Sequence, residues 1–158
     1  MRRLSLFSAV AALVLAAPLV TPASAGQYNS APTYQSATSN AFAKHGSASA
    51  LSLNNNAVDQ SNLSFGGKKW GFQSNSAPTS QHATSNAYAR HGDASATSVN
   101  TNQIIQENVR VGGKKSPTFQ SNSAPTSQSA VSTAVSIGGN ANALSANANG
   151  VSQSNGRE

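Results

Sequence analysis

The side chains that could perform acid–base or metal chemistry are few in this chain. Its three histidines are His45, His82 and His91. His45 and His91 occupy equivalent positions in two copies of a repeat, and the third copy has Gly138 there. A zinc site needs three or four ligands at suitable spacing. We therefore interpret the histidines as solvated turn residues and expect neither a metal nor another cofactor.

The carboxylates and the glycine–lysine segments give no catalytic pattern either. Asp59, Asp93 and Glu107 are isolated and have no counterparts in the other copies, so they do not support a paired-carboxylate mechanism. The Gly-Gly-Lys-Lys segments at 66–69 and 112–115 lack the glycine spacing and the final Ser or Thr of a phosphate-binding loop. We expect this protein not to be an enzyme.

Asn and Gln are abundant, and their spacing is regular. The segment Gln27–Gln35 returns as Gln73–Gln81 and Gln120–Gln128, at offsets of 46 and 47 residues. A second block begins at Ala48 and keeps every second residue when it returns from Ala94 and Ala141, with one Val/Ile exchange. Side chains on a strand alternate between two faces, whereas a helix would keep residues three or four apart. The pattern therefore predicts long strands with one fixed face.

Repeated polar residues on a fixed face favour stacked layers. Identical residues at identical offsets can lie above one another, and Asn and Gln then form amide ladders between layers about 4.7–4.8 Å apart. Such pairing explains polar residues on the fixed face, because burying an unpaired amide is costly. The predicted ladder residues are Gln27, Asn29, Gln35, Asn54, Asn56, Gln60, Gln73, Asn75, Gln81, Asn100, Asn102, Gln106, Gln120, Asn122, Gln128, Asn147, Asn149 and Gln153.

The predicted fold is therefore all-β, a repeat β-solenoid or cross-β stack of three 46-residue repeats. Related Asn and Gln spacings within each repeat leave open six rungs of about 23 residues. Composition agrees with stacking. Only 18 of the 133 residues from 26 to 158 are Leu, Ile, Val or Phe, and 51 are Ser, Asn or Gln. That apolar share, about 14%, is too small for an ordinary packed core, and disorder would not require one face to be kept.

The chain divides into a leader and three repeats. Residues 1–25 have the pattern of a secretory signal peptide, with Arg2 and Arg3, an apolar run over 4–20 and small residues at 23–25. Pro18 and the shortness of the run argue against a membrane anchor. We expect a secreted, extracellular protein at the cell surface. The repeats are 26–72, 73–119 and a truncated 120–158.

Glycine and proline mark the predicted boundaries within each repeat. Pro32, Pro78 and Pro125 predict a bend or bulge in the first block, because proline donates no backbone hydrogen bond. Turns are expected at the segments 44–46, 90–92 and 137–139, and longer loops at 66–71 and 112–117.

The charge after removal of the leader is basic. Eight basic and four acidic residues remain, a net charge of +4. Lys68, Lys69, Lys114 and Lys115 lie in matching loops. One interpretation is a basic stripe for polysaccharide, lipid headgroups or nucleic acid. We favour the other, that these lysines keep the sheets soluble and limit edge pairing. No specific nucleic-acid partner is expected. The chain has no cysteine, so no disulfide holds it together outside the cell.

The short motif Asn-x-Ala-x-x-x-Gln resembles the repeat of the curlin subunits of bacterial curli fibres. It reads NSAPTYQ at Asn29–Gln35, and NSAPTSQ at Asn75–Gln81 and Asn122–Gln128. The wider class is that of functional amyloids exported to the bacterial surface. The resemblance implies a subunit that is exported unfolded and assembles outside by templating, with the Asn and Gln residues as its ladders.

These observations favour a structural subunit of surface fibres that serve adhesion and biofilm matrix. Its partners would be further copies of itself, a nucleator or secretion partner, and an acidic polysaccharide or cell surface. One alternative is a monomeric β-solenoid that binds a repeating surface such as ice through outward residues like Thr97 and Val99. Another is an anchoring adhesin or fibre nucleator that is held to an acidic surface by its basic charge.

Overall fold

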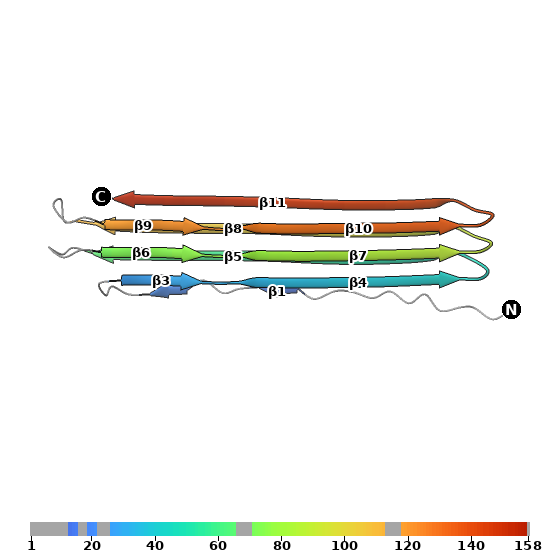
Figure 1. Ribbon diagram of the computed structural model, residues 1–158, viewed down its shortest axis with the longest axis horizontal. Coiled ribbons are helices and arrows are strands. Elements are labelled where there is room, and N and C mark those ends of the chain that lie inside the picture. The colour runs from blue at the N-terminus through green and yellow to red at the C-terminus, as the bar shows by residue number, and fades with distance from the viewer. Residues whose placement is uncertain (1–12, 16–18, 22–25, 66–70, 113–117, 158) are drawn as a thin grey trace.

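A computed structural model describes residues 13–15, 19–21, 26–65, 71–112 and 118–157 of the chain. All of its regular structure in these ranges is β (Figure 1). The strands are β1 (Leu13–Leu15), β2 (Leu19–Thr21), β3 (Gly26–Ser30), β4 (Thr33–Ala43), β5 (Ala48–Phe65), β6 (Gly71–Ser76), β7 (Thr79–Ala89), β8 (Ala94–Val111), β9 (Thr118–Ser123), β10 (Thr126–Ser136) and β11 (Ala141–Arg157).

Each repeat forms one layer of a three-layer stack (Figure 1). In the first layer the chain runs out along β3 and β4 and returns along β5. The next layers repeat this path as β6, β7, β8 and as β9, β10, β11. Like strands pair in parallel and in register, so that Gln35 lies beside Gln81 and Asn54 lies beside Asn100. The prediction of an all-β solenoid of three 46-residue repeats is confirmed.

The alternative of six rungs of about 23 residues is wrong. Strand pairing joins residues 46 or 47 positions apart, as for Thr33 with Thr79 and Thr79 with Thr126. The two halves of one repeat instead lie on opposite sides of the interior, where β4 contacts β5 through side chains. The similar Asn and Gln spacing of the two halves reflects this, because both halves supply one face to the same interior.

The interior between the facing sheets is thin and mostly polar. Along β5 and β8 buried residues alternate with exposed or half-buried ones, as the period of two predicts. The buried apolar residues are chiefly small: one cluster contains only alanines, and a second contains Val58, Ala77 and Ile104. Small side chains let the two sheets approach closely, which brings the remaining inward residues, Asn, Gln and Ser, within hydrogen-bonding distance of the opposite sheet.

Proline interrupts the outgoing half of every layer, as predicted. In the first layer β3 ends at Ser30 and β4 begins at Thr33, with Ala31 and Pro32 between them. The flanking amides still bond to the next layer, from Ala31 N to Ser76 O at 2.8 Å and from Thr33 N to Pro78 O at 2.9 Å. The stack therefore loses only the hydrogen bond that proline cannot donate.

The turn from the outgoing to the returning half also lies where predicted. β4 ends at Ala43 and β5 begins at Ala48, so Lys44, His45 and Gly46 form the turn. Gly46 has a φ of 101°, a conformation that favours glycine. The loops predicted at 66–71 and 112–117, with Lys68, Lys69, Lys114 and Lys115, lie almost wholly outside the described residues.

Two short segments of the predicted leader pair with the outer edge of the first layer. Val14 in β1 lies beside Asn56, and Leu19 in β2 lies beside Gln60. The prediction of a signal peptide over 1–25 stays a prediction. Within the described ranges, no helix is long and apolar enough to cross a membrane.

Candidate functional site: amide ladders and open sheet edges

The predicted ladder residues form six columns that run through the three layers. In every column each side-chain amide bonds to its copy in the next layer, at 2.6–3.2 Å between nitrogen and oxygen. The columns are Gln27–Gln73–Gln120, Asn29–Asn75–Asn122, Gln35–Gln81–Gln128, Asn54–Asn100–Asn147, Asn56–Asn102–Asn149 and Gln60–Gln106–Gln153.

The same amides also tie the two facing sheets together. Gln81 Nε2 donates to Gln35 Oε1 along the stack at 2.6 Å and to the backbone oxygen of Thr101 across the interior at 2.9 Å. Asn100 Nδ2 likewise donates to Asn147 Oδ1 at 2.9 Å and to Ser129 O at 2.7 Å. An amide nitrogen has two hydrogens, so one side chain joins both the layers and the sheets.

The ladder residues of the third layer are less buried than those of the first two. All twelve predicted ladder residues of the first two layers are buried. In the third layer Gln120, Asn122 and Gln128 are half-buried, and Asn147 and Gln153 are exposed. The third layer has the same residue types but is an uncovered end of the stack, whereas β1 and β2 pair with part of the first layer.

A seventh column contains Asn62, Asn108 and Asn155, at kept positions that were not among the predicted ladder residues. Asn62 Nδ2 donates to Asn108 Oδ1, which lies one layer on, at 2.9 Å. The column also bonds across the interior: Asn29 Nδ2 donates to Asn62 Oδ1 at 2.9 Å, and Asn62 Nδ2 donates to Asn75 Oδ1 at 2.9 Å. Two columns of asparagine therefore form one zigzag network. The period of two placed Asn62 inward and was the signal that could have identified it.

Arg110 is a second inward residue that sequence reasoning missed. It is 4% exposed and lies in register with Ser64 below and Arg157 above. Arg110 follows Asn108 by two residues, so the same alternation places it on the fixed face. The third layer repeats this arginine as Arg157.

Hydrogen bonds in the ladders have opposite directions in the two residue types. In the asparagine columns the earlier layer donates, as from Asn54 Nδ2 to Asn100 Oδ1 and from Asn100 Nδ2 to Asn147 Oδ1. In the glutamine columns the later layer donates, as from Gln81 Nε2 to Gln35 Oε1 and from Gln128 Nε2 to Gln81 Oε1. All seven columns follow this rule.

The stack ends in two sheet edges with almost no charge. We call the outer side of β9, β10 and β11 the end edge, and that of β3, β4 and β5 the start edge. The strands β9–β11 contain one charged residue, Arg157 at the end of β11, and β3–β5 contain one, Asp59. Edge strands are ordinarily protected by charge, proline, bulges or shortness. Here β10 and β11 are 11 and 17 residues long.

The histidines lie outside this arrangement. His45 and His91 are exposed in adjacent turns, with their rings stacked at a centroid distance of 5.4 Å. His82 lies not in a turn but on the exposed face of β7, where its Nε2 is 3.0 Å from the hydroxyl of Thr84. Among the described residues, no group of three His, Cys, Asp or Glu side chains could hold a metal ion.

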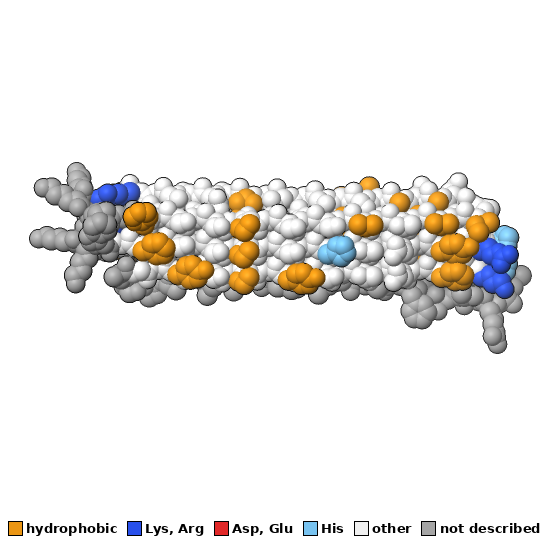
Figure 2. All heavy atoms as spheres, viewed as in Figure 1, with side chains coloured by type: hydrophobic (Ala, Val, Ile, Leu, Met, Phe, Trp, Pro, Cys, Tyr) orange, Lys and Arg blue, Asp and Glu red, His pale blue; other side chains and the backbone are white. Residues whose placement is uncertain are grey.

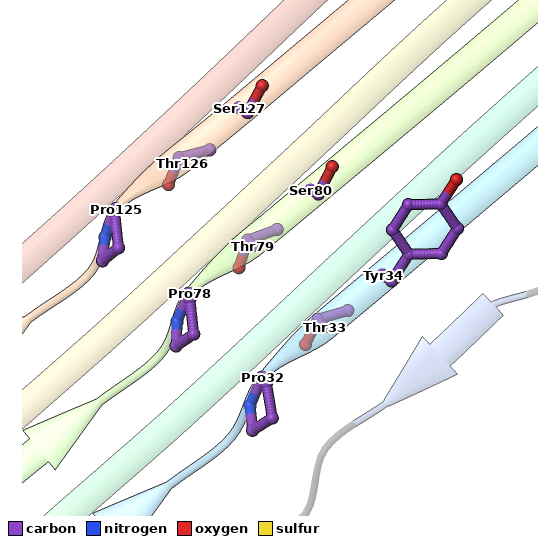
Figure 3. A pocket seen from close by; sticks show the side chains of 9 residues that line it. All are labelled: Pro32, Thr33, Tyr34, Pro78, Thr79, Ser80, Pro125, Thr126 and Ser127. Atoms are coloured by element: carbon purple, nitrogen blue, oxygen red, sulfur yellow. The ribbon is translucent and has the colours of Figure 1, made fainter.

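The outer surface of the outgoing strands is mostly uncharged. Figure 2 shows hydrophobic side chains there in short columns along the stack, with basic side chains near the ends. One open groove of about 480 Å³ follows the proline column Pro32, Pro78 and Pro125, with Thr, Ser and Tyr34 side chains beside it (Figure 3). Its lining has hydroxyl groups and no charged group.

Comparison with known families, curated proteins and solved structures gives no match in any of the three. The geometry alone therefore classifies the chain: it is a repeat parallel β-solenoid with buried Asn and Gln ladders.

Proposed function

We propose that this chain is a secreted structural subunit of amyloid-like fibres on a bacterial surface, of the curli type, and that the fibres serve adhesion and biofilm matrix. The subunit is non-enzymatic, and its principal partner is another copy of itself. A nucleator or secretion partner starts assembly, and an acidic polysaccharide or cell surface attracts its basic charge.

The observation that carries this proposal is the pair of long, nearly uncharged edges that close the stack once residues 1–25, with β1 and β2, are removed from the start edge. Unpaired backbone N–H and C=O groups on an edge strand are a template for another chain. The end-layer amides add to that template, because Asn147 and Gln153 are exposed while their copies inside the stack are buried. When two different surfaces of one molecule bind each other without closing a ring, a filament results.

Two sequence features support the extracellular setting. The leader pattern over residues 1–25 predicts export, and Asn-x-Ala-x-x-x-Gln, as at Asn29–Gln35, resembles the repeat of curlin subunits. The chain has no cysteine, so layer-to-layer hydrogen bonds have to supply the durability that secreted proteins often obtain from disulfides.

The ice-binding alternative receives less support. A flat ice-binding face requires regular outward columns, but Leu51, Thr97 and Leu144 share one outward column and Leu53, Val99 and Ala146 share the next. The inward columns are the more regular ones. The adhesin or nucleator alternative differs from the fibre subunit in where the chain is found, and the following experiment separates them.

The test is immunogold electron microscopy of cells that produce the protein, with a matched strain that lacks residues 1–25. We expect labelled fibres outside the first strain, labelled along their length, and none outside the second. Gold confined to fibre ends or to the cell envelope would indicate a nucleator or anchor. Soluble extracellular protein without fibres would contradict the proposal.

A further inference from the structure

The two ends of the stack are chemically complementary in their side-chain amides. At the end edge, the Nδ2 groups of Asn147 and Asn149 donate to no other described residue, although the same atoms of Asn100 and Asn102 donate to the next layer. At the start edge, Asn56 has the opposite deficit. Its Oδ1 atom is buried and has no hydrogen-bond partner, and the residue is 1% exposed.

Buried acceptors without donors are uncommon in native structures and need an explanation. Inside the stack the same oxygen is satisfied: Asn102 Oδ1 accepts from Asn56 Nδ2, and Asn149 Oδ1 accepts from Asn102 Nδ2, both at 2.8 Å. The group missing at Asn56 is therefore the amide of one preceding layer. In the structure β1 pairs with this part of the start edge, and Val14, which lies beside Asn56, is not an amide residue. Removal of residues 1–25 therefore opens the Asn56 oxygen to the amide of another copy.

The glutamine columns are also complementary at the two edges, but here the end edge has the free acceptors and the start edge has the donors. Within the stack Gln128 donates to Gln81, and Gln153 donates to Gln106. The Oε1 atoms of Gln128 and Gln153 accept no hydrogen bond within the described ranges and face the end edge. At the start edge Gln60 donates only to Ser76 O at 3.2 Å in the structure described, so its second N–H can donate to a preceding layer.

We propose that the end edge of one copy binds the start edge of the next, head to tail, and that the opposed asparagine and glutamine ladders set this direction. The proposal rests on the proposed function and names its interface. Asn147 and Asn149 donate to Asn54 and Asn56 of the next copy, while its Gln60 donates back to Gln153.

The reversed arrangements lack this match. Two start edges would bring the Oδ1 acceptors of their asparagines together, and two end edges would bring Nδ2 donors together. Charge also disfavours the contact of two start edges with their turns aligned, which would bring Lys44 beside Lys44. Lys44 and Arg90 occupy equivalent turn positions in neighbouring layers, and the third layer has Ile137 at that position. Head-to-tail stacking therefore inserts a neutral layer between Arg90 and the next Lys44.

Cysteine cross-linking tests the direction, because the natural chain has no cysteine. Ser36 and Ser129 are exposed and lie in register with His82, one layer to either side. Within one copy they are two layers apart, about 9.5 Å, which is too far for a disulfide. Across a head-to-tail junction the same two positions are one layer apart, about 4.8 Å, which a disulfide can span.

We expect fibres of the double variant Ser36→Cys/Ser129→Cys to give a ladder of covalent multimers on oxidation. Fibres of either single variant should give almost none. Cross-β fibres without multimers in the double variant, or with disulfide dimers in a single variant, would overturn the direction and leave the proposed function intact. Absence of any assembly would overturn both.

A second test alters one atom of the end edge. Asn147→Asp keeps an oxygen that accepts from Asn100 Nδ2 but removes the onward donor and adds an acceptor that faces Asn54 Oδ1 of the next copy. Ala148→Asp adds the same charge on the outward face of the same strand and is the control. We expect Asn147→Asp to slow fibre growth at least about tenfold and Ala148→Asp less than about threefold. Equal effects would overturn the proposal.

Discussion

Replacing Gln81 with leucine tests the amide ladders at their centre. Gln81 is 1% exposed and makes three side-chain hydrogen bonds. Its Nε2 donates to Gln35 Oε1 at 2.6 Å and to Thr101 O at 2.9 Å, and its Oε1 accepts from Gln128 Nε2 at 2.7 Å. Leucine is of similar size but bonds to none of these groups, so the substitution isolates the amide.

The magnitude follows from the number of bonds. Each hydrogen bond contributes about 1 kcal/mol net, and a buried group left without a partner costs about 1–3 kcal/mol. We therefore expect Gln81→Leu to lower the free energy of unfolding by about 3–5 kcal/mol, a large part of the stability of an ordinary domain. Gln128→Leu is the matched control. Gln128 donates to Gln81 Oε1 and to Ala148 O at 3.1 Å, but it is half-buried. Water can replace the bond to Ala148 O, whereas the buried Gln81 Oε1 loses its donor, so the expected loss is about 2 kcal/mol.

The assay is urea unfolding of freshly diluted protein beginning at residue 26, followed by circular dichroism before fibres form. With a slope of about 1–3 kcal/mol per molar urea, the midpoint should fall by about 2 M for Gln81→Leu and by about half as much for Gln128→Leu. Equal midpoints for the two variants would refute the idea that buried amides hold the layers together.

Three further predictions concern charge, close packing and the leader. Asn100→Asp should destabilise the stack at neutral pH, because burial raises the pKa of the new carboxyl above its unfolded value. The free energy of unfolding, measured from pH 3 to 8, should be highest below the unfolded pKa of about 3.9 and should fall as pH rises through the raised folded pKa. A flat profile would contradict the burial. Gly92→Ala should lower the free energy of unfolding by about 2–3 kcal/mol, because the new Cβ would meet the Gly46 carbonyl. Gly156 has open space around it, so Gly156→Ala should change the free energy of unfolding little. Similar melting temperatures for the two variants would contradict this explanation. The uncleaved chain should form fibres more slowly than the chain beginning at residue 26, because β1 and β2 occupy part of the start edge; equal lag times in a light-scattering assay would show that these segments do not block the edge.

Much of the fold could be predicted from the sequence because alternate side chains of a strand lie on opposite faces, so a buried face appears as every second residue. Ala48 and every second residue after it are kept, and those positions are the buried face of β5. The 46-residue offset likewise predicted which residues become neighbours, since a parallel in-register stack places copy above copy. Pro32 marked the break between β3 and β4 because its missing N–H is a local property of one residue.

Other features depend on three-dimensional relations that a linear pattern does not contain. Whether the halves of a repeat stack or face each other is decided by the turn at Gly46 and by the closeness of the two sheets. The direction of the ladders depends on side-chain torsions, so Asn100 and Gln81 donate in opposite senses although both are amides. Arg110 was missed because the first copy has Ser64 at its position, so the alternation of kept residues ends at Asn108 although the strand continues with Arg110 inside.

Fibre X-ray diffraction on assembled protein beginning at residue 26 tests whether the subunits stack into cross-β fibres. Stacked layers predict a meridional reflection at about 4.7–4.8 Å and an equatorial one near 10 Å. Because the three layers of a copy differ, head-to-tail stacking also predicts a weaker meridional reflection at about 14 Å, three layers apart. A protein that stays monomeric, or fibres whose 4.7–4.8 Å reflection does not lie along the fibre axis, would contradict it.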